Sequence, residues 1–385
     1  MRAPQPGPLR RRIVAALEGA APAAPGAGDS TQAGAVGAAP SRAIIEKESI
    51  MPAPITRALA AILLLCAVSP SLGQDKAAID AALKAAHGKY AGLKEGKNAD
   101  YIPALAKVPS NLFGIALVTV DGEVHTIGDV DQLFSIQSIS KVFTMAEVMQ
   151  ASGDKAIEDG VGVDATGQVF NSITAVERDK GHEMNPFVNP GAIATTSMVT
   201  GGSEQAIWDK IIGIQSAFAG RPLQVNQEVY KSESDTNQRN QAIGMLMYAY
   251  GLIKENPARA TDLYTRQCSV NVNAKDLATM AATLANGGKN PVTKKQVLDA
   301  NLVPKVLAVM ATAGMYDDSG KWLYATGLPA KSGVGGGVIA VSPGKFGIAV
   351  ISPPLDAAGN SVKAQKAIAD ISNALGGNPY APRAH

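Results

Sequence analysis

Strand-forming segments lie near the beginning and near the end of this chain, with a long stretch of helical pattern between them. The segments with strand pattern are residues 113–120, 123–127, 337–342 and 347–352. Asp121 and Gly122 favour a tight hairpin between the first two, and Pro343 and Gly344 join the last two. This arrangement predicts an antiparallel sheet assembled from distant parts of the chain, with a helical lobe inserted in the middle.

Other segments carry the apolar spacing of amphipathic helices. They are residues 75–90, 203–218, 240–253, 274–285, 295–313 and 362–375. We therefore expect an α/β chain of the α+β type with two lobes. The sheet lobe takes about residues 74–137 and 321–385, and the helical lobe takes about residues 145–320.

The first part of the chain differs in composition from the rest. Residues 1–50 are crowded with Ala, Pro, Gly and Arg and lack periodicity, which predicts a disordered or spurious extension. Residues 51–73 begin at a second methionine, contain an apolar run too short to span a bilayer, and end in small residues. This pattern is typical of a signal peptide rather than a buried helix. We expect a mature protein that starts near Gln74 and is periplasmic or secreted, or cytoplasmic if the leader is not used.

Composition limits the classes of partner. With 46% hydrophobic and 18% charged residues, the chain is ordinary for a globular protein with a large core. A net charge of +2 gives no indication of a nucleic-acid partner or of a membrane surface. The four histidines lack metal-ligand spacing, so no metal or other cofactor is expected. Cys66 lies in the leader, without the small preceding residue usual at lipid-attachment sites, which leaves Cys268 without a disulfide partner.

Ser138 and Lys141 stand three residues apart, so a helix would place the hydroxyl and the amine on one face. A serine hydroxyl becomes a good nucleophile beside a base, and a lysine is a base only where burial or neighbours keep it uncharged. Apolar residues supply such surroundings, namely Leu133, Phe134, Ile136, Ile139, Val142, Phe143 and Met145. Taken alone, the pair is equally compatible with a structural serine beside a solvated lysine.

A second lysine motif lies near the C-terminal end. Lys331, Ser332 and Gly333 come just before a glycine-rich stretch and the apolar run 337–342. Serine acyl-transferring enzymes of the penicillin-recognising type pair an early Ser-x-x-Lys helix with a late Lys-Ser/Thr-Gly edge strand. A dinucleotide site is not expected, because the glycines follow no predicted strand and open no predicted helix. These motifs predict a β-lactamase/DD-peptidase-like fold with Ser138 at the join between the lobes, where ligand sites concentrate.

Several segments together resemble the serine-dependent glutaminase family of the β-lactamase-like fold, in its bacterial form. They are residues 99–103, 134–141, 185–193, 232–233 with 239–240, 264–269, 314–317 and 331–337, in family order. The family often has Ala where this chain has Pro190, a change that leaves the Asn189 side chain in place. The resemblance implies hydrolysis of L-glutamine to L-glutamate and ammonia through a γ-glutamyl-serine ester, without a cofactor, in a homodimer or homotetramer. Family members are commonly cytoplasmic or organellar, so the apparent leader is a departure.

The resemblance assigns the catalytic roles residue by residue. It implies that Ser138 is the nucleophile and that Lys141 takes its proton. Lowering the pKa of that amine from about 10.4 to about 7 corresponds to roughly 4–5 kcal/mol, to which Lys331 could contribute as a flanking cation. The backbone N–H groups of Ser138 and Val334 would stabilise the oxyanion, helped by the glycines after Val334.

The remaining implied residues line the pocket and hold the free amino acid. Tyr101, Tyr264 and Tyr316 would relay protons or hold substrate. Glu233 would bind the ammonium group of glutamine. The other implied substrate contacts are Gln137, Ser138, Asn189, Asn240, Tyr264, Tyr316 and Val334.

Two other functions fit parts of the pattern. A serine β-lactamase or penicillin-binding-protein-type acyl hydrolase would explain the leader and both lysine motifs, but the chain lacks a Ser-Asp-Asn type element in context, and the set that binds an amino acid would have no purpose. A non-catalytic amino-acid-binding protein would explain the pocket, but retention of Ser138, Lys141 and Lys331 argues against it.

Overall fold

Three strands of the main sheet, β1 (Gly114–Thr119), β7 (Gly337–Ser342) and β8 (Phe346–Ile351), are buried on both faces, which explains their near-continuous apolar sequence. The sheet also contains β2 (Val124–Gly128) and β6 (Ala330–Gly333). In this computed structural model the strand order is β2-β1-β8-β7-β6, and all neighbours run antiparallel. The sheet therefore joins early and late parts of the chain, as the sequence predicts.

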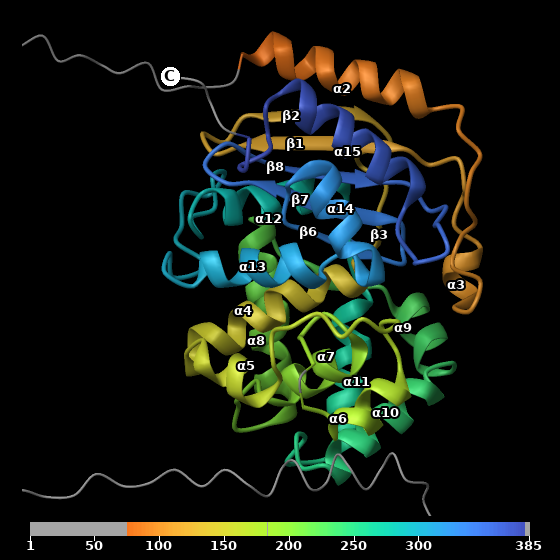
Figure 1. Cartoon of the computed structure of the whole chain (residues 1–385), viewed down its shortest axis with the longest axis vertical. Helices are drawn as coiled ribbons and strands as arrows, with labels where there is room; N and C mark the ends of the chain where they lie inside the picture. The colour runs from red at the N-terminus through yellow and green to blue at the C-terminus, as the bar shows by residue number, and fades with distance from the viewer. Residues whose placement is uncertain (1–74, 183, 382–385) are drawn as a thin grey trace, which may run out of the picture. The chain divides into compact units, whose positions relative to one another are not determined.

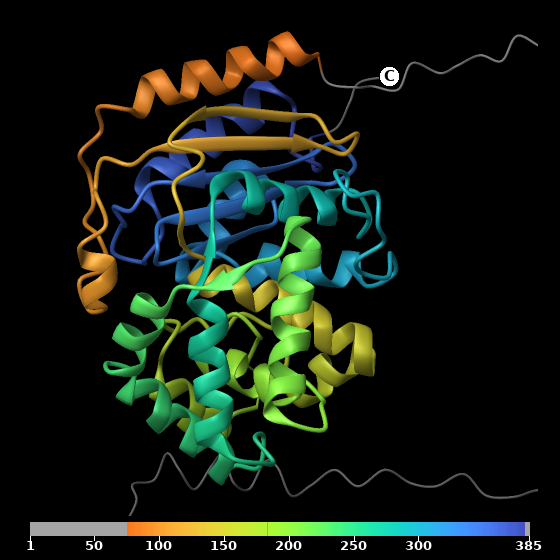
Figure 2. The same cartoon turned by 180° about the vertical axis from the view of Figure 1, so that it is seen from behind.

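Helices cover both faces of this sheet (Figures 1 and 2). On one face, α2 (Lys76–Tyr90) and α15 (Val362–Ala374) pack together over Ile115 and Leu117 of β1. On the other, α12 (Ala274–Ala285) packs over Ala116 and Val118. Alternation of side chains along a strand produces this division. Gly347 of β8 lets α12 approach closely, because a Cβ there would lie 2.0 Å from the Ala282 nitrogen.

A second group of helices lies beyond α12 and forms the inserted lobe (Figure 1). Its helices are α4 (Ser140–Ser152), α5 (Lys155–Gly160), α6 (Ile173–Asp179), α7 (Asn189–Ser197), α8 (Glu204–Ala219), α9 (Gln227–Ser234), α10 (Gln238–Ala249) and α11 (Pro257–Cys268). A small antiparallel sheet, β3-β5-β4, joins α4, α9 and α11 to the rest; its strands are β3 (Phe134–Ser135), β5 (Val270–Val272) and β4 (Gln224–Val225).

Short elements complete the region between the lobes. They are α3 (Pro103–Ala106), η1 (Gln137–Ile139), α13 (Val303–Ala313), η2 (Tyr316–Asp318) and α14 (Ser319–Thr326). The 3₁₀ helix η1 continues directly into α4, and β6 packs against η1. Both lysine motifs therefore meet at this point.

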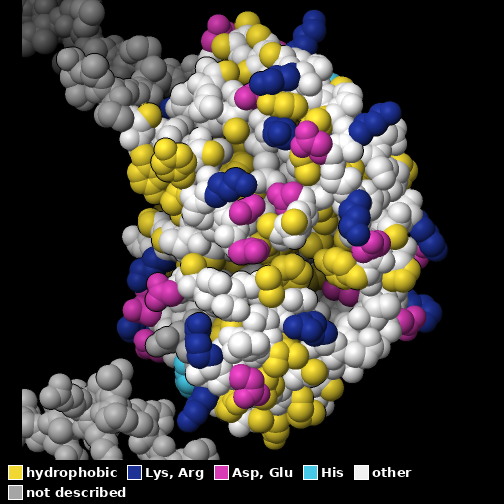
Figure 3. Space-filling view, turned by 45° about the vertical axis from the view of Figure 1, so that its right-hand side comes forward, with side chains coloured by type: hydrophobic (Ala, Val, Ile, Leu, Met, Phe, Trp, Pro, Cys, Tyr) yellow, Lys and Arg dark blue, Asp and Glu magenta, His cyan; other side chains and the backbone are white. Residues whose placement is uncertain are grey.

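The structure describes residues 75–182 and 184–381, all within the unit formed by residues 67–385. The expected extension 1–50 and signal peptide 51–73 lie outside the described residues. Among the described helices, none combines the length and the apolar character needed to cross a bilayer. On the face in Figure 3, basic and acidic side chains are interspersed, and a hollow with hydrophobic side chains crosses the middle.

Most predicted elements are confirmed within two residues at each end, but two boundaries are wrong. The helix expected over 295–313 begins at Val303, because Asp299 accepts a hydrogen bond from the Asn301 nitrogen in a turn and Pro304 occupies the first helical turn. The helix expected over 240–253 ends at Ala249, where Gly251 adopts a left-handed backbone with φ 78°.

Candidate active site

A pocket of about 270 Å3 opens where η1, the end of β6 and the helices of the inserted lobe meet. Its lining residues are Tyr101, Ile102, Gln137, Ser138, Phe170, Asn171, Asn189, Glu233, Thr236, Asn237, Arg239, Asn240, Tyr264 and Val334. All the site residues expected from the sequence line this pocket, except Lys141 and Tyr316. Those two lie directly behind it, since Lys141 bonds Asn189 and Tyr316 bonds Ser138.

The Lys141 amine is fully buried in the first turn of α4, three residues after Ser138 of η1. A spacing of three residues aligns side chains along a 3₁₀ helix. The amine donates to the Phe187 carbonyl at 3.1 Å and to the Asn189 Oδ1 at 2.8 Å. Burial lowers the pKa of Lys141 to about 8. A neutral amine has two N–H bonds, so these two acceptors leave its lone pair available as a base.

Asn189 connects the buried Lys141 amine to the pocket. Its Oδ1 accepts from Lys141 and, at 3.1 Å, from the Tyr264 hydroxyl. Its Nδ2 donates to the Asn240 Oδ1 at 2.9 Å. Asn189 begins α7, and Pro190 follows it in the first turn, where a missing backbone N–H costs nothing. The departure from the family at Pro190 therefore leaves the Asn189 contacts intact.

Lys331 is a second fully buried amine, in the edge strand β6. It donates to the carbonyls of Gly314 at 3.1 Å and Ser332 at 2.7 Å, and it lies 4.4 Å from the centre of the Tyr316 ring. Burial, and secondarily the charge of Lys141, lowers the pKa of Lys331 well below its usual range. Burial is thus the main cause of the low pKa of Lys141, and the flanking-cation role expected for Lys331 is not supported.

Glu233 is a buried carboxylate at the other end of the pocket. It accepts from the Gln137 Nε2 at 3.2 Å, and Gln137 also donates to the Ser135 Oγ. Burial raises the pKa of Glu233 to about 7, against smaller opposing effects of Gln137 and Lys141. A buried carboxylate without a full ionic partner favours a cationic ligand group. Tyr101 lies at the mouth, with 54% of its surface exposed.

Two residues with strained backbones lie beside Ser138. Gln137 and Tyr316 both adopt left-handed conformations, with φ of 51° and 54°, which non-glycine residues rarely occupy. The Tyr316 hydroxyl donates to the Ser332 carbonyl at 3.3 Å, and its side chain is hydrogen-bonded to Ser138. The strained residues thus flank Ser138 from two sides, with Gln137 bonded to Glu233 and Tyr316 bonded to Ser138, and no sequence pattern predicts this strain.

Val334 follows β6, and glycines around it allow the chain to approach η1. A Cβ at Gly333 would lie 2.8 Å from the Ile136 carbonyl oxygen, and a Cβ at Gly335 would lie 2.7 Å from that of Ser135. Only glycine fits such contacts. The backbone of Val334 is in this way held in the pocket wall beside Ser138.

Comparison with known proteins decides the family. Residues 96–380 match the sequence model of the glutaminase family. The chain belongs to the glutaminase family. The glutaminase of Colwellia psychrerythraea is 54% identical over 302 residues, which cover 78% of this chain and 97% of the relative. The glutaminase of Brucella canis is 52% identical over 308 residues, which cover 80% and 96%.

Solved structures of glutaminases share the fold. A probable glutaminase, YbaS, has a TM-score of 0.78 and 46% identity, covering 80% of this chain and 99% of that one. A probable glutaminase from Bacillus subtilis, solved with 6-diazo-5-oxo-L-norleucine, has a TM-score of 0.70 and 27% identity, covering 78% and 96%. The predicted β-lactamase-like fold and the predicted hydrolysis of glutamine to glutamate are both confirmed.

The glutaminase pocket contains residues to which sequence reasoning gave no role. Phe170 and Asn171 reach it from the loop before α6, and the Arg239 Nε donates to the Asn171 carbonyl at 3.0 Å. Asn237 bonds the Thr265 hydroxyl and thereby joins α11 to the start of α10. Asn237 and Arg239 lie just before Asn240 in the sequence, and this proximity could have indicated that they belong to the same pocket. Within the described ranges, no group of His, Cys, Asp or Glu side chains is placed to hold a metal ion.

Proposed function

We propose that this glutaminase acts through a γ-glutamyl ester of Ser138, with Lys141 as the general base. The observation that carries the proposal is the buried Lys141 amine, whose two N–H bonds already have acceptors. Ser138 attacks the side-chain amide carbon of glutamine, and its proton passes to Lys141. The C–N bond then breaks, Lys141 returns the proton to the nitrogen, and ammonia leaves. Water attacks the ester by the same route, releasing glutamate and restoring Ser138.

Neighbouring groups stabilise the charges that develop. The backbone N–H groups of Ser138 and Val334 are the donors for the tetrahedral oxyanion. The Tyr316 side chain is hydrogen-bonded to Ser138, and its hydroxyl donates to the Ser332 carbonyl. Tyr316 therefore holds the nucleophile in place. Tyr264 shares Asn189 with Lys141 and assists proton movement, while Tyr101 covers the mouth of the pocket.

The amino acid part of glutamine is held at the end of the pocket away from Lys141. Glu233 binds the ammonium group in exchange for part of its contact with Gln137. Asn240, Asn189 and Tyr264 supply neutral donors for the carboxylate and carbonyl groups. A pocket of about 270 Å3 is at the small end of ligand sites, as expected for a free amino acid.

One edge contact of β6 argues against the penicillin-recognising alternative. The Ser332 nitrogen donates to the Gly314 carbonyl at 3.1 Å, and Lys331 donates to the same oxygen. This N–H group of β6 is therefore not available to pair with an extended peptide. We expect purified protein to release ammonia from glutamine and to leave a chromogenic cephalosporin intact. Rapid opening of the cephalosporin ring without ammonia release would contradict this assignment.

The pH dependence of kcat/KM follows from the two buried groups. Glu233 must be ionised and Lys141 must be neutral in the free enzyme, so activity rises with pH through apparent pKa values of about 7 and about 8. We expect steady-state kinetics between about pH 5.5 and 9, a range that brackets both groups, to show a steeper slope of kcat/KM against pH below the lower pKa value.

Glu233→Gln tests the lower limb of that profile. This change should raise KM about 100-fold, since truncating a buried ionic partner costs several kcal/mol. The pH profile of kcat/KM should then keep only the rise at the apparent pKa of about 8. Glu228→Gln, an exposed change on the same helix, is the matched control and should keep both limbs. An unchanged KM in Glu233→Gln would remove Glu233 from the ammonium site.

We propose that residues 51–73 are a cleaved export signal and that the enzyme is periplasmic or secreted. Their apolar run and small terminal residues support this. N-terminal sequencing of the native protein should find an end near Gln74. An end at Met1 or Met51 would place the enzyme in the cytoplasm instead.

We also propose that the enzyme is a homodimer or homotetramer. Exposed apolar side chains on α10, Met245 with 58% and Tyr248 with 48% of their surfaces accessible, offer a contact surface. Light scattering after gel filtration should give a mass of two or four chains. A monomer at all concentrations would contradict this proposal.

A further inference from the structure

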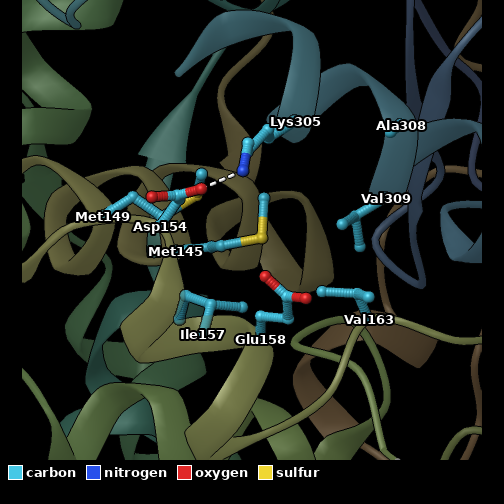
Figure 4. Close-up of a pocket in the computed structure, with 9 residues that line it drawn as sticks. All are labelled: Met145, Met149, Asp154, Ile157, Glu158, Val163, Lys305, Ala308 and Val309. Carbon is cyan, nitrogen blue, oxygen red and sulfur yellow. Dashed lines mark hydrogen bonds and ion pairs between the residues drawn. The ribbon is translucent and has the colours of Figure 1, made fainter. Parts of the chain in front are cut away.

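A second cavity, of about 210 Å3, lies further along α4, between that helix, α5 and α13 (Figure 4). Its walls are mostly apolar and include Met145, Met149, Ile157 and Val309, all nearly inaccessible to bulk solvent. The cavity opens to solvent past Glu158 and Lys305, whose side chains are about half exposed. A dry apolar cavity of about 150 Å3 accepts benzene, so this one has room for an aromatic ring and a short chain.

The lining favours a cation with an aromatic body. Figure 4 shows the Met145 thioether between the Asp154–Lys305 ion pair and the Glu158 carboxylate. Thioethers make favourable contacts with aromatic rings. The lining carries two carboxylates, Asp154 and Glu158, and one amine, Lys305, so it is negative overall.

Glu158 is the carboxylate that a ligand could reach. Its partner outside the lining is Lys155 at 3.4 Å, and both side chains are more than half exposed. Exposed pairs of this kind contribute little, so a ligand ammonium can replace Lys155 at small cost. Asp154, by contrast, is less exposed and bonded to Lys305.

The cavity touches α4, which carries Lys141, and α13, which ends beside a carbonyl acceptor of Lys331. Lys141, Met145 and Met149 are spaced four residues apart and share one face of α4. The α13 helix ends at Ala313, directly before Gly314, whose carbonyl oxygen accepts from Lys331. A molecule wedged between α4 and α13 therefore presses on the supports of both amines.

We propose that this cavity is a second ligand site, for a small arylalkylammonium ion, and that its occupancy changes kcat. The binding part is independent of the proposed mechanism, whereas the effect on kcat rests on it. Nothing in the substrate pocket contributes to the cavity lining, so the two sites can be tested separately.

The probes are benzylamine, benzyl alcohol and phenylacetate, which share a ring and differ in charge. Calorimetric titration of the full chain at neutral pH should show one saturable site for benzylammonium, with Kd of about 1 mM or tighter. Benzyl alcohol should bind about threefold more weakly, the difference that one exposed ion pair supplies. Phenylacetate should not bind. With glutamine saturating, benzylammonium should change kcat by about twofold or more, a small shift in barrier.

Two variants and one crystal decide the location. Ala308→Trp places a large side chain over the cavity from an exposed position and should weaken benzylammonium binding more than about tenfold. Glu158→Gln should abolish the preference for the ammonium over the alcohol, whereas the exposed control Glu204→Gln should retain it. In crystals with 4-bromobenzylamine, the anomalous signal of bromine should lie beside Met145.

Distinct results would overturn each part. Absence of saturable binding, undiminished binding in a folded Ala308→Trp variant, or bromine located elsewhere would refute the site. Benzylammonium binding that leaves kcat unchanged would refute the coupling. A Ser138→Ala variant that binds benzylammonium normally separates failure of the proposed mechanism from failure of this site.

Discussion

Ser138→Ala is expected to release ammonia from glutamine at least about a thousandfold more slowly than the wild type, because no other group can form the ester. Glutamine binding should persist, since Glu233 and Asn240 are untouched. Ammonia release under saturating glutamine measures the first effect, and calorimetric titration measures the second. Tight retention of glutamine by an inactive variant would separate binding from chemistry.

Ser140→Ala is the matched control for this change. Its hydroxyl is also buried, but it contacts the Cys268 sulfur at 3.6 Å and does not line the pocket. Removal of this weak contact should leave kcat within about threefold of the wild-type value. Ammonia release by Ser138→Ala at the wild-type rate would show that the nucleophile is misassigned.

Lys141→Met is expected to lower kcat by about a thousandfold or more while keeping KM within about threefold, because the base acts on the reaction and not on binding. Methionine fills a similar volume without an amine. Lys141→Arg should be equally inactive, since a guanidinium is not deprotonated in proteins. Steady-state kinetics of all three proteins measures these effects.

Folding must be checked beside the kinetics of Lys141→Met. The change leaves the acceptors on Phe187 and Asn189 without their donor, which costs about 1–3 kcal/mol of stability. Thermal unfolding followed by circular dichroism should show this moderate loss and a folded protein at room temperature. Lys76→Met, an exposed change on α2, should alter neither stability nor rate. Near-normal activity in a folded Lys141→Met variant would assign the base elsewhere.

Most of the sheet was predictable because its central strands β1, β8 and β7 are buried on both faces. Segments such as 113–120 and 337–342 are apolar at almost every position, and this pattern can be recognised in the sequence without knowledge of tertiary contacts. The β3-β5-β4 sheet was not predictable, since strands of two or three residues carry too little pattern to separate them from loops. The start of α13 was missed because an apolar sequence continued through a turn fixed by Asp299.

Most residues of the pocket were predictable, but the contacts between them were not. Spacing alone placed Ser138 beside Lys141, and family order added the remaining pocket residues. The left-handed backbones of Gln137 and Tyr316 depend on tertiary contacts that over-determine an unfavourable conformation. The bridge from Lys141 through Asn189 to Asn240 joins three helices and is invisible in one dimension. The uncharged state expected for Lys141 was attributed partly to Lys331, whereas burial accounts for most of it.

Mass spectrometry of the acid-quenched enzyme tests the central claim most directly. Wild-type protein mixed with glutamine, stopped within one turnover and digested, should carry one γ-glutamyl group on the peptide that contains Ser138. Ser138→Ala treated in the same way should carry none. A γ-glutamyl group on another residue, or full turnover with no modified peptide at any time, would contradict the account.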